Sequence, residues 1–189
     1  MRDECFIRGN VPMTKSEVRA VSLSKMEIRH DSIIYDVGAG TGSVSVEAAM
    51  MAPQGQVYAF EQKEEACGLI EQNREKFRLN NLTVIPGKAP ESMREAPAPD
   101  CVFLGGSGGK LAEILDLVLQ KNPSVRIVIN VIVLESLAGV LTYLKQKKLE
   151  AEIVTVQVSR AESIREFHMM QALNPVTVIA VGGSQEGLI

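Results

Sequence analysis

Short apolar runs alternate with longer amphipathic stretches along this chain. A run of roughly four to eight apolar residues is typical of a buried strand, and a longer stretch with helical periodicity is typical of a helix. The strands predicted in this way cover residues 33–37, 56–60, 82–85, 100–104, 125–133, 149–158 and 176–181. The predicted helices begin near residue 13 and further along cover residues 43–51, 64–79, 111–120 and 134–147.

Strands and helices alternate up to the last two strands, which have no predicted helix between them. Such alternation predicts an α/β fold, in which a mostly parallel sheet carries helices on both faces. The terminal strand is expected to run antiparallel, because a parallel connection needs a crossover helix. We therefore expect a Rossmann-like, doubly wound sheet of seven strands in one domain over residues 1–189, with residues 1–30 as an N-terminal cap segment.

A glycine-rich turn follows the first predicted strand and places Gly38, Gly40 and Gly42 at alternate positions. Glycine lets the backbone turn sharply and leaves no side chain between the loop and a ligand. A helix that begins directly after Gly42 would point its free N–H groups at that ligand. The pattern indicates a nucleotide site at the carboxyl end of the first strand.

The residues around this loop narrow the choice of nucleotide. Ser43 stands where the common dinucleotide pattern has its last glycine, and no Lys-Ser or Lys-Thr pair follows to form a Walker-type cradle. Asp36 precedes the loop, and Glu61 ends the next apolar run, at the interval expected for a carboxylate that binds ribose hydroxyls. This arrangement resembles motif I of class I S-adenosylmethionine-dependent methyltransferases, whose loop (here also Ala39 and Thr41) wraps the methionine part of the cofactor. A glycine turn in an NAD-type or non-catalytic Rossmann domain is the alternative.

Composition and charge exclude some partners. The hydrophobic fraction of 46% suits an ordinary globular core, and no apolar run approaches the length of a membrane span. The net charge of −3 and the lack of tryptophan argue against a nucleic-acid partner. The three cysteines have no metal-binding spacing, so we expect no metal site. Residues 1–12 contain no secretory segment, so we expect a cytoplasmic protein.

The first predicted helix carries charges that its own stability does not require. Thr14 is predicted to cap this helix, with Glu17 completing a capping box. Lys15 and Arg19 lie four residues apart, which places two like charges on one face of the helix. That face is either solvated or binds an anion.

A second glycine-rich loop, residues 105–109, directly follows the fourth predicted strand. In an open α/β sheet this loop borders the same crevice as the first one, so it either faces the substrate or is a flexible connector. Asn130 lies in the fifth predicted strand, and a buried amide needs hydrogen-bond partners. It is therefore either a satisfied structural amide or a substrate contact.

The second loop also bears on the class of methyl acceptor. Methylation of an adenine amine usually needs an Asn/Asp-Pro-Pro-aromatic turn, where this chain has Gly-Gly-Ser-Gly-Gly. Methylation of cytosine at C5 needs a cysteine in the loop, but Cys101 lies inside the strand. Catechol-type O-methylation needs a group of acidic metal ligands, and the sequence indicates none.

Three further motifs, together with motif I, indicate a particular family. They are the segments 12–20, 103–109 and 158–161, the last with Asn-Pro-Val at 174–176. Over residues 8–182 the chain resembles the decarboxylating precorrin methyltransferases of cobalamin synthesis, the CbiT family, also found as the C-terminal half of the fused enzyme CobL. The resemblance implies methylation of (cobalt-)precorrin-6B at C15 with decarboxylation of its C12 acetate. It also implies a homotetramer and a contact with the C5-methyltransferase of the same pathway.

The resemblance assigns cofactor contacts to Thr14, Gly38 to Gly42, Glu61 and Ala89. A corrin precursor carries many carboxylates, which cations and open glycine loops would accommodate. The candidate substrate-binding residues are Lys15, Arg19, Gly105, Gly106, Ser107, Gly108, Lys110, Asn130, Arg160 and Arg165. Glu135 and His168 are the candidate catalytic residues, because decarboxylation must be followed by protonation. The alternatives are an RNA or protein methyltransferase of the same fold and a non-catalytic S-adenosylmethionine-binding domain.

Overall fold

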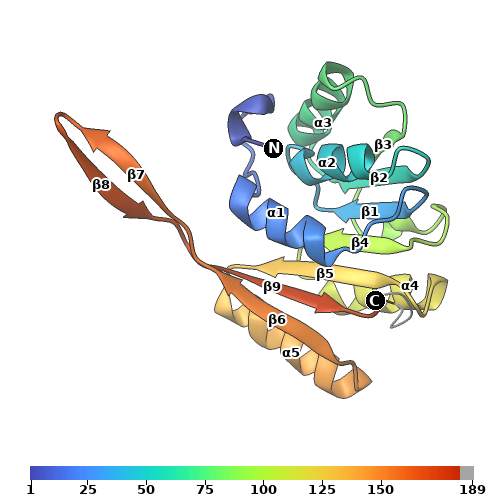
Figure 1. Cartoon of the computed structure of the whole chain (residues 1–189). Helices are drawn as coiled ribbons and strands as arrows, with labels where there is room; N and C mark the ends of the chain where they lie inside the picture. The colour runs from blue at the N-terminus through green and yellow to red at the C-terminus, as the bar shows by residue number, and fades with distance from the viewer. Residues whose placement is uncertain (184–189) are drawn as a thin grey trace.

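The computed structural model describes residues 1–183 and contains a seven-stranded sheet (Figure 1). The strands lie in the order β3-β2-β1-β4-β5-β9-β6. Their bounds are β1 Ile33–Val37, β2 Gln56–Glu61, β3 Leu82–Pro86, β4 Cys101–Leu104, β5 Arg126–Val131, β6 Ala151–Val156 and β9 Val176–Val181. The strand order reverses between β1 and β4, and an open α/β sheet forms its ligand crevice at such a point.

Parallel pairing extends from β3 through β2, β1 and β4 to β5, whereas β9 runs antiparallel to both β5 and β6. The predicted α/β class, the seven strands and the antiparallel last strand are therefore confirmed. Strand β9 lies inside the sheet, where Ile179 is opposite Ile129 on one side and Ile153 on the other. The central strands are buried on both faces, which explains why β1 is apolar at every position except Asp36 and does not alternate.

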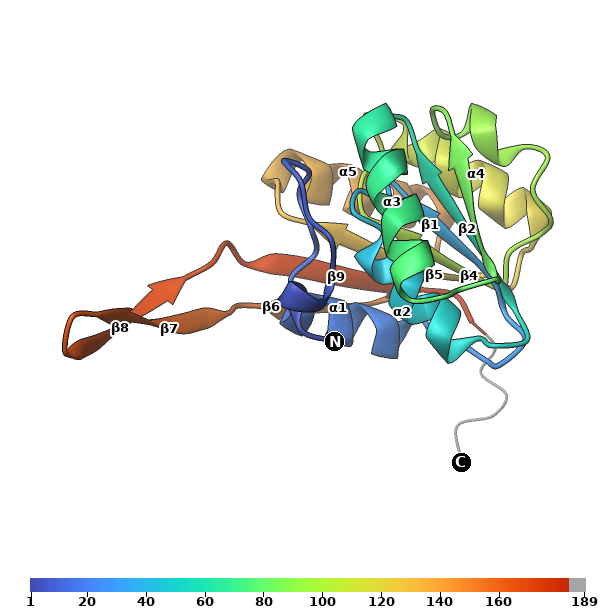
Figure 2. The same ribbon diagram turned by 90° about the horizontal axis from the view of Figure 1, so that it is seen from above.

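Within residues 1–183, five α-helices cover the two faces of this sheet. Their bounds are α1 Ser16–Lys25, α2 Ser43–Met51, α3 Glu64–Lys76, α4 Leu111–Lys121 and α5 Leu134–Lys147. Helices α1, α2 and α3 lie on one face, and α4 and α5 lie on the other (Figures 1 and 2). Each face has its own apolar core, with Val44 and Ile70 in one core and Ile114 and Tyr143 in the other. This three-layer arrangement holds the carboxyl ends of the parallel strands at one edge.

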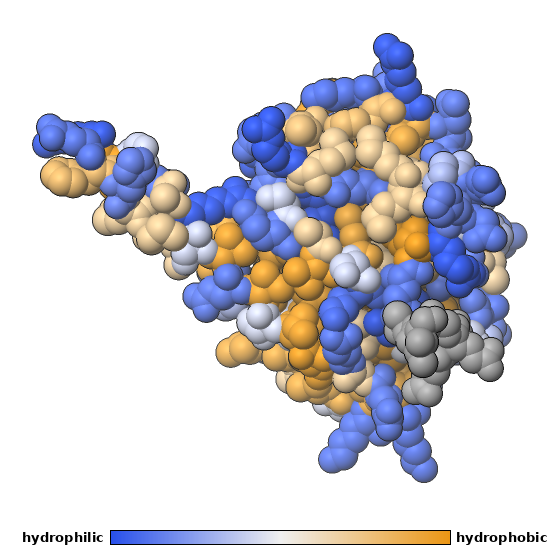
Figure 3. All heavy atoms as spheres, in the orientation of Figure 1, coloured by the Kyte–Doolittle hydropathy of each residue, from blue (hydrophilic) through white to orange (hydrophobic). Residues whose placement is uncertain are grey.

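A separate hairpin connects β6 to β9. It consists of β7 (Ser159–Ile164) and β8 (Phe167–Ala172) and projects away from the body (Figures 1 and 2). Its apolar side chains are largely exposed in the described part of the chain: Phe167 is 74% exposed and Met170 is 63% exposed. In the space-filling view, hydrophobic side chains also gather on the body beside the base of the hairpin (Figure 3). The sequence pattern did not predict these two strands.

The chain before the first strand contains α1 and a segment that precedes it. A short 3-10 helix, η1 (Asp3–Cys5), precedes an extended segment that leads into α1. The N-cap of α1 is Lys15 in an extended conformation, and no side chain caps the helix. The predicted capping box of Thr14 and Glu17 is therefore wrong. Within residues 1–183, no helix is both long enough and apolar enough to span a bilayer.

Candidate functional site

A cavity of about 970 Å³ lies at the carboxyl ends of β1, β4 and β5. Both glycine loops line it, as do the segment of residues 11–15, the turn after β5, and the base of the hairpin at Val158 and Leu173. This volume is at the upper end of the range of about 300–1,000 Å³ that is usual for small-molecule sites. The cavity therefore has room for a nucleotide-sized ligand and part of a second molecule.

The two glycine loops touch each other at the floor of the cavity. Gly38 has a φ of +72°, and a Cβ atom there would lie 2.7 Å from the carbonyl oxygen of Gly106. The Gly38 amide donates to the carbonyl of Phe60 at 2.9 Å, which ties the first loop to the end of β2. Only glycine permits both this conformation and this approach, so the sequence pattern has a direct structural reason.

Glu61 is fixed beside the first loop by backbone donors. Its Oε1 accepts hydrogen bonds from the amides of Gln62 at 2.8 Å and Lys63 at 2.9 Å, and its Oε2 accepts one from Gly40 at 3.0 Å. The side chain is 8% exposed and lines the cavity. A carboxylate held in this way presents acceptor oxygens in a constant position. Gln62 and Lys63 also line the cavity, although sequence reasoning did not select them.

Three of the predicted cofactor residues do not line the cavity. Asp36 is 1% exposed, Thr41 is 1% exposed, and Gly42 packs against Ile70. The Ser45 hydroxyl donates to Oδ2 of Asp36, while Oδ1 has no partner among the described residues. Burial raises the pKa of Asp36 to about 7. These residues pack within and behind the loop, and their direct contact with the cofactor stays a prediction.

Ala89 is also absent from the cavity wall. It is partly buried and packs against the core on the α4 and α5 face. The cofactor contact at Ala89 that the family resemblance implies stays a prediction.

The second loop and the end of β5 form the opposite wall. Residues 105–109 all line the cavity, and so do Asn130 and Glu135. Asn130 exchanges hydrogen bonds with the Ser22 hydroxyl of α1, with its Nδ2 at 2.9 Å from the hydroxyl oxygen, so its amide is at least partly satisfied within the protein. Ile132 and Val133 line the cavity as well and are 61% and 55% exposed. Sequence reasoning placed them inside a strand, but β5 ends at Val131.

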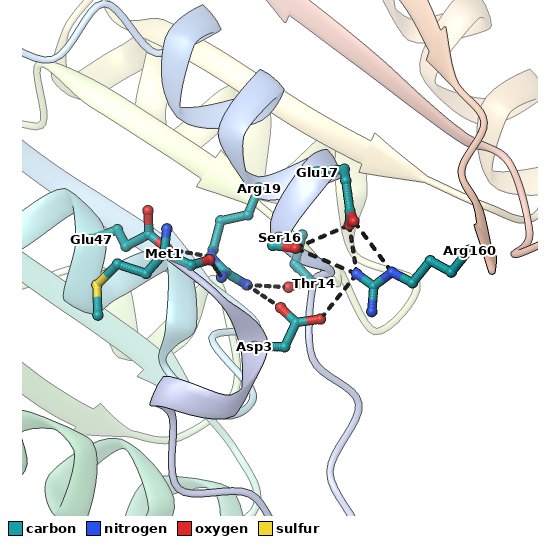
Figure 4. A network of polar contacts seen from close by, with 8 residues as sticks. All are labelled: Met1, Asp3, Thr14, Ser16, Glu17, Arg19, Glu47 and Arg160. Carbon is teal, nitrogen blue, oxygen red and sulfur yellow. Dashed lines mark hydrogen bonds and ion pairs between the residues drawn. The ribbon is translucent and has the colours of Figure 1, made fainter. Parts of the chain in front are cut away.

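Arg19 is buried in a polar network and does not line the cavity (Figure 4). The side chain is 0% exposed. Its guanidinium bonds Oε1 of Glu47 at 2.7 Å, Oδ1 of Asp3 at 3.3 Å and the carbonyl of Met1 at 2.7 Å, and it also bonds the carbonyl of Thr14. All of its donor nitrogens are engaged within the protein, so Arg19 is not carried into the substrate site proposed below.

Arg160 belongs to the same network. Its Nη2 lies 2.6 Å from Oε2 of Glu17 and 3.3 Å from Oδ2 of Asp3. The Arg160 guanidinium holds the pKa of Glu17 at about 2. Because its charge is already compensated by carboxylates, Arg160 is not a free cation for a substrate in this arrangement.

The remaining predicted residues divide by position. Thr14, Lys15 and Glu135 line the cavity, whereas Lys110 pairs with Glu113 at 2.8 Å beside it. Arg165 and His168 lie on the hairpin, and neither lines the cavity (Figure 1). The charged residues that do line it are Lys15, Glu61, Lys63 and Glu135. The cavity thus combines glycine backbone, apolar walls and a few opposed charges.

Comparison with known proteins gives this arrangement a family. A family model described as a precorrin methyltransferase domain matches residues 4–182. The chain belongs to the precorrin methyltransferase family. A relative named cobalt-precorrin-6B C(15)-methyltransferase (decarboxylating), from Salmonella typhimurium, is 42% identical over 95% of this chain and 94% of its own length. A probable enzyme of the same name from Pyrobaculum calidifontis is 42% identical over 94% of this chain and 92% of its own length.

Solved structures agree with the family assignment. A precorrin-6y C5,15-methyltransferase from Geobacter metallireducens superposes with a TM-score of 0.90 at 36% identity and covers 96% of this chain and 97% of its own. A precorrin 8W decarboxylase from Methanobacterium thermoautotrophicum has a TM-score of 0.90 at 33% identity, with 96% and 99% covered. A tRNA methyltransferase from Aquifex aeolicus, with a TM-score of 0.74 at 16% identity over 98% of this chain and 77% of its own, shares the fold alone. The precorrin methyltransferase family therefore has the class I methyltransferase fold.

Proposed function

We propose that this protein uses S-adenosylmethionine to methylate C15 of (cobalt-)precorrin-6B and decarboxylates the C12 acetate, in cobalamin biosynthesis. The single observation that carries the proposal is the 42% identity, over 95% of the chain, to a relative named for this reaction. The meeting of both glycine loops at one cavity supports it independently.

The residues around the first loop fit S-adenosylmethionine. The backbone of Gly38 and Gly40 leaves no side chain over the floor of the cavity, where a Cβ atom at Gly38 would already collide with the second loop. The fixed Glu61 carboxylate suits the hydroxyl groups of a ribose. Thr14, which also lines the cavity, would complete the cofactor site. When bound, the cofactor supplies an electrophilic methyl group on a sulfonium.

The other walls fit a large conjugated anion. Ile132 and Val133 present apolar surface to the cavity, which suits the face of a macrocycle. Lys15 and Lys63 supply cations for peripheral carboxylates. Because the acceptor carbon of the macrocycle is electron-rich, the protein mainly has to align the two reactants and exclude water, and a protein nucleophile is unnecessary.

Decarboxylation requires a proton donor as well as a site. Loss of carbon dioxide from the acetate leaves an electron pair that the conjugated ring accepts, and a proton must then reach the remaining carbon to form a methyl group. We assign that role to Glu135, which lines the cavity in the first turn of α5. His168, on the projecting hairpin, is not retained for it.

The assembly implied by the family resemblance has a candidate surface in the hairpin. Ile164, Phe167, Met169 and Met170 are 46%, 74%, 60% and 63% exposed, which is costly unless another chain covers them. We propose that the hairpin joins subunits of a homotetramer. The C5-methyltransferase of the same pathway is proposed as a partner, because the Geobacter relative is named for both positions. Light scattering of Phe167→Ser tests the tetramer: an unchanged mass would contradict it.

The activity assay should follow two products from one incubation. The protein is mixed with methyl-labelled S-adenosylmethionine and with precorrin-6B, with or without cobalt, and both methyl transfer and carbon dioxide release are measured. Gly40→Val serves as the control: the residue has a φ of +57°, and a Cβ atom there would lie 3.0 Å from the carbonyl oxygen of Pro12. We expect both products from the wild type and neither from the variant.

Two results would favour the alternatives. Transfer of label to RNA or protein, with none to the precorrin, would indicate a methyltransferase of the same fold with another substrate. Failure to bind S-adenosylhomocysteine in calorimetry would indicate a domain without this cofactor. The acidic pI of about 5.5 speaks against RNA, which a basic surface would favour.

A further inference from the structure

Residues 11–15, here called the strap, form one wall of the cavity but belong to no helix or strand. Two arginines hold the elements on either side of the strap. The guanidinium of Arg19 is buried and bonds the carbonyl of Thr14 near the end of the strap. Segments without regular secondary structure open more readily than helices or strands, so such contacts bear directly on the position of the strap.

Asp3 joins the two arginines (Figure 4). Its Oδ1 lies 3.3 Å from Nη1 of Arg19, and its Oδ2 lies 3.3 Å from Nη2 of Arg160. Arg160 comes from β7 at the base of the hairpin and also bonds Glu17, in the first turn of α1, shortly after the strap. The hairpin base, the N-terminal segment and the first turns of α1 therefore share one set of ion pairs, and the strap joins the last two of these elements.

We infer that Arg160 is a positioning residue for the cavity: through Glu17 and Asp3 it fastens the strap to the base of the hairpin. Arg160 does not line the cavity, but Val158 and Leu173 beside it do, and the Leu173 amide donates to the Val158 carbonyl at 2.8 Å. The strap and the base of the hairpin, which these ion pairs connect, thus both belong to the cavity wall. The inference rests on the proposed function in one respect, namely that the ligand used to test it is S-adenosylhomocysteine.

Because the Arg160–Glu17 pair is partly exposed, replacing Arg160 can change the cavity with little effect on the free energy of unfolding. The Arg160 side chain is 37% exposed and that of Glu17 is 42% exposed, and ion pairs at such positions contribute little to the free energy of unfolding. The buried Asp3 carboxylate keeps its ion pair with Arg19 when Arg160 is replaced. Releasing the strap would nevertheless lower the population of the closed cavity. If that population falls to roughly one tenth, the apparent Kd of the ligand rises about tenfold.

The experiment compares Arg160→Met with Arg165→Met in the full-length protein. Both substitutions remove one arginine from the same hairpin, but Arg165 lies at the turn and has no ion pair with another described residue. Calorimetry gives the Kd of S-adenosylhomocysteine, and hydrogen exchange gives the protection of the strap amides. We expect Arg160→Met to raise the Kd about tenfold and to speed exchange in residues 13–15, and Arg165→Met to change the Kd less than about twofold.

A kinetic readout distinguishes positioning from a general loss of structure. Arg160→Met should raise the KM for S-adenosylmethionine more than it lowers kcat, and Arg160→Lys should restore part of the affinity. If Arg160→Met unfolds or changes the subunit number, Glu17→Gln replaces it, because that variant weakens the fastening and keeps the Asp3 contact.

Two outcomes would overturn the inference. One is an unchanged Kd and unchanged strap exchange in both Arg160→Met and Glu17→Gln. The other is an equal loss of affinity in Arg165→Met, which would indicate an effect of overall charge. If the wild type fails to bind S-adenosylhomocysteine, the proposed function fails instead, and strap exchange without ligand still decides whether Arg160 holds the strap.

Discussion

Replacement of Gly38 by alanine tests the contact between the two glycine loops. A Cβ atom at Gly38 would lie 2.7 Å from the carbonyl oxygen and 2.9 Å from the nitrogen of Gly106. Both atoms belong to backbone, which cannot rotate away as a side chain would. The substitution therefore has to displace one loop from the other, at the floor of the cavity.

The cost of Gly38→Ala has two parts. A φ of +72° places alanine in the left-handed region, at about 1–2 kcal/mol. Displacement of the loops adds a strain of about 1 kcal/mol or more, of the kind seen when extra atoms are forced into a packed site. We expect the free energy of unfolding to fall by about 2–3 kcal/mol, and Tm by roughly 4–12 °C for a chain of this size.

Two other glycines provide matched controls. A Cβ atom at Gly68 in α3 would meet no described atom within 4 Å, so Gly68→Ala should raise the free energy of unfolding by about 0.5–1 kcal/mol. A Cβ atom at Gly106 would also meet none within 4 Å, but this residue lines the cavity. Gly106→Ala should therefore leave stability nearly unchanged and weaken ligand binding. Together the three variants separate strain in the fold from obstruction of the site.

Urea denaturation measures the three stabilities, and calorimetry with S-adenosylhomocysteine measures binding. We expect Gly38→Ala to lose at least tenfold in affinity, equivalent to about 1.4 kcal/mol. The reasoning is refuted if Gly38→Ala unfolds within about 0.5 kcal/mol of the wild type and binds the ligand equally well.

Three further predictions concern charged groups. Arg19→Met leaves the Asp3 and Glu47 carboxylates without their buried partner and should lower the free energy of unfolding by about 3–5 kcal/mol in urea; a loss below about 1 kcal/mol would contradict this. Glu61→Gln should weaken S-adenosylhomocysteine binding at least about tenfold in calorimetry, because one acceptor oxygen facing backbone N–H groups becomes a donor; unchanged affinity would argue against the ribose role. Asp36 has an ordinary pKa of 3.8 in the unfolded chain, and burial raises its pKa to about 7 in the folded protein. Between these two pH values only the folded state keeps the proton, so this group makes the free energy of unfolding fall as pH rises. Asp36→Asn should remove that part of the slope in urea midpoints measured from about pH 4 to 8; an unchanged slope would contradict it.

The sequence was most informative where structure is encoded locally. The first loop and Glu61 were predicted together because parallel strands end at one edge of a sheet, so residues that follow neighbouring strands meet there. Gly38, Gly40 and Gly42 all have positive φ, a backbone conformation that favours glycine, and this explains why glycine stands at each of these positions.

Features that depend on distant partners could not be predicted in this way. The four-residue spacing between Lys15 and Arg19 predicts that both lie on one face of a helix, but it does not show whether that face is exposed. Arg19 is buried by contacts with Asp3 and Glu47, and neither is its neighbour in the sequence. The hairpin has no buried face in the single chain, so β7 and β8 lack the apolar alternation that marks a strand. Ile132 was placed inside a strand because an apolar run does not reveal where pairing ends.

The position of β9 has a consequence for how the chain is made. During translation, β5 and β6 are synthesised before β9. The position between these two strands in the sheet is occupied by residues 176–181, which are synthesised later. Until then, the edge of β5 is open along a run of apolar residues, and such an edge can pair with other nascent chains. Completion of the sheet is therefore a late step, and a chain that ends before Val176 would carry an aggregation-prone edge.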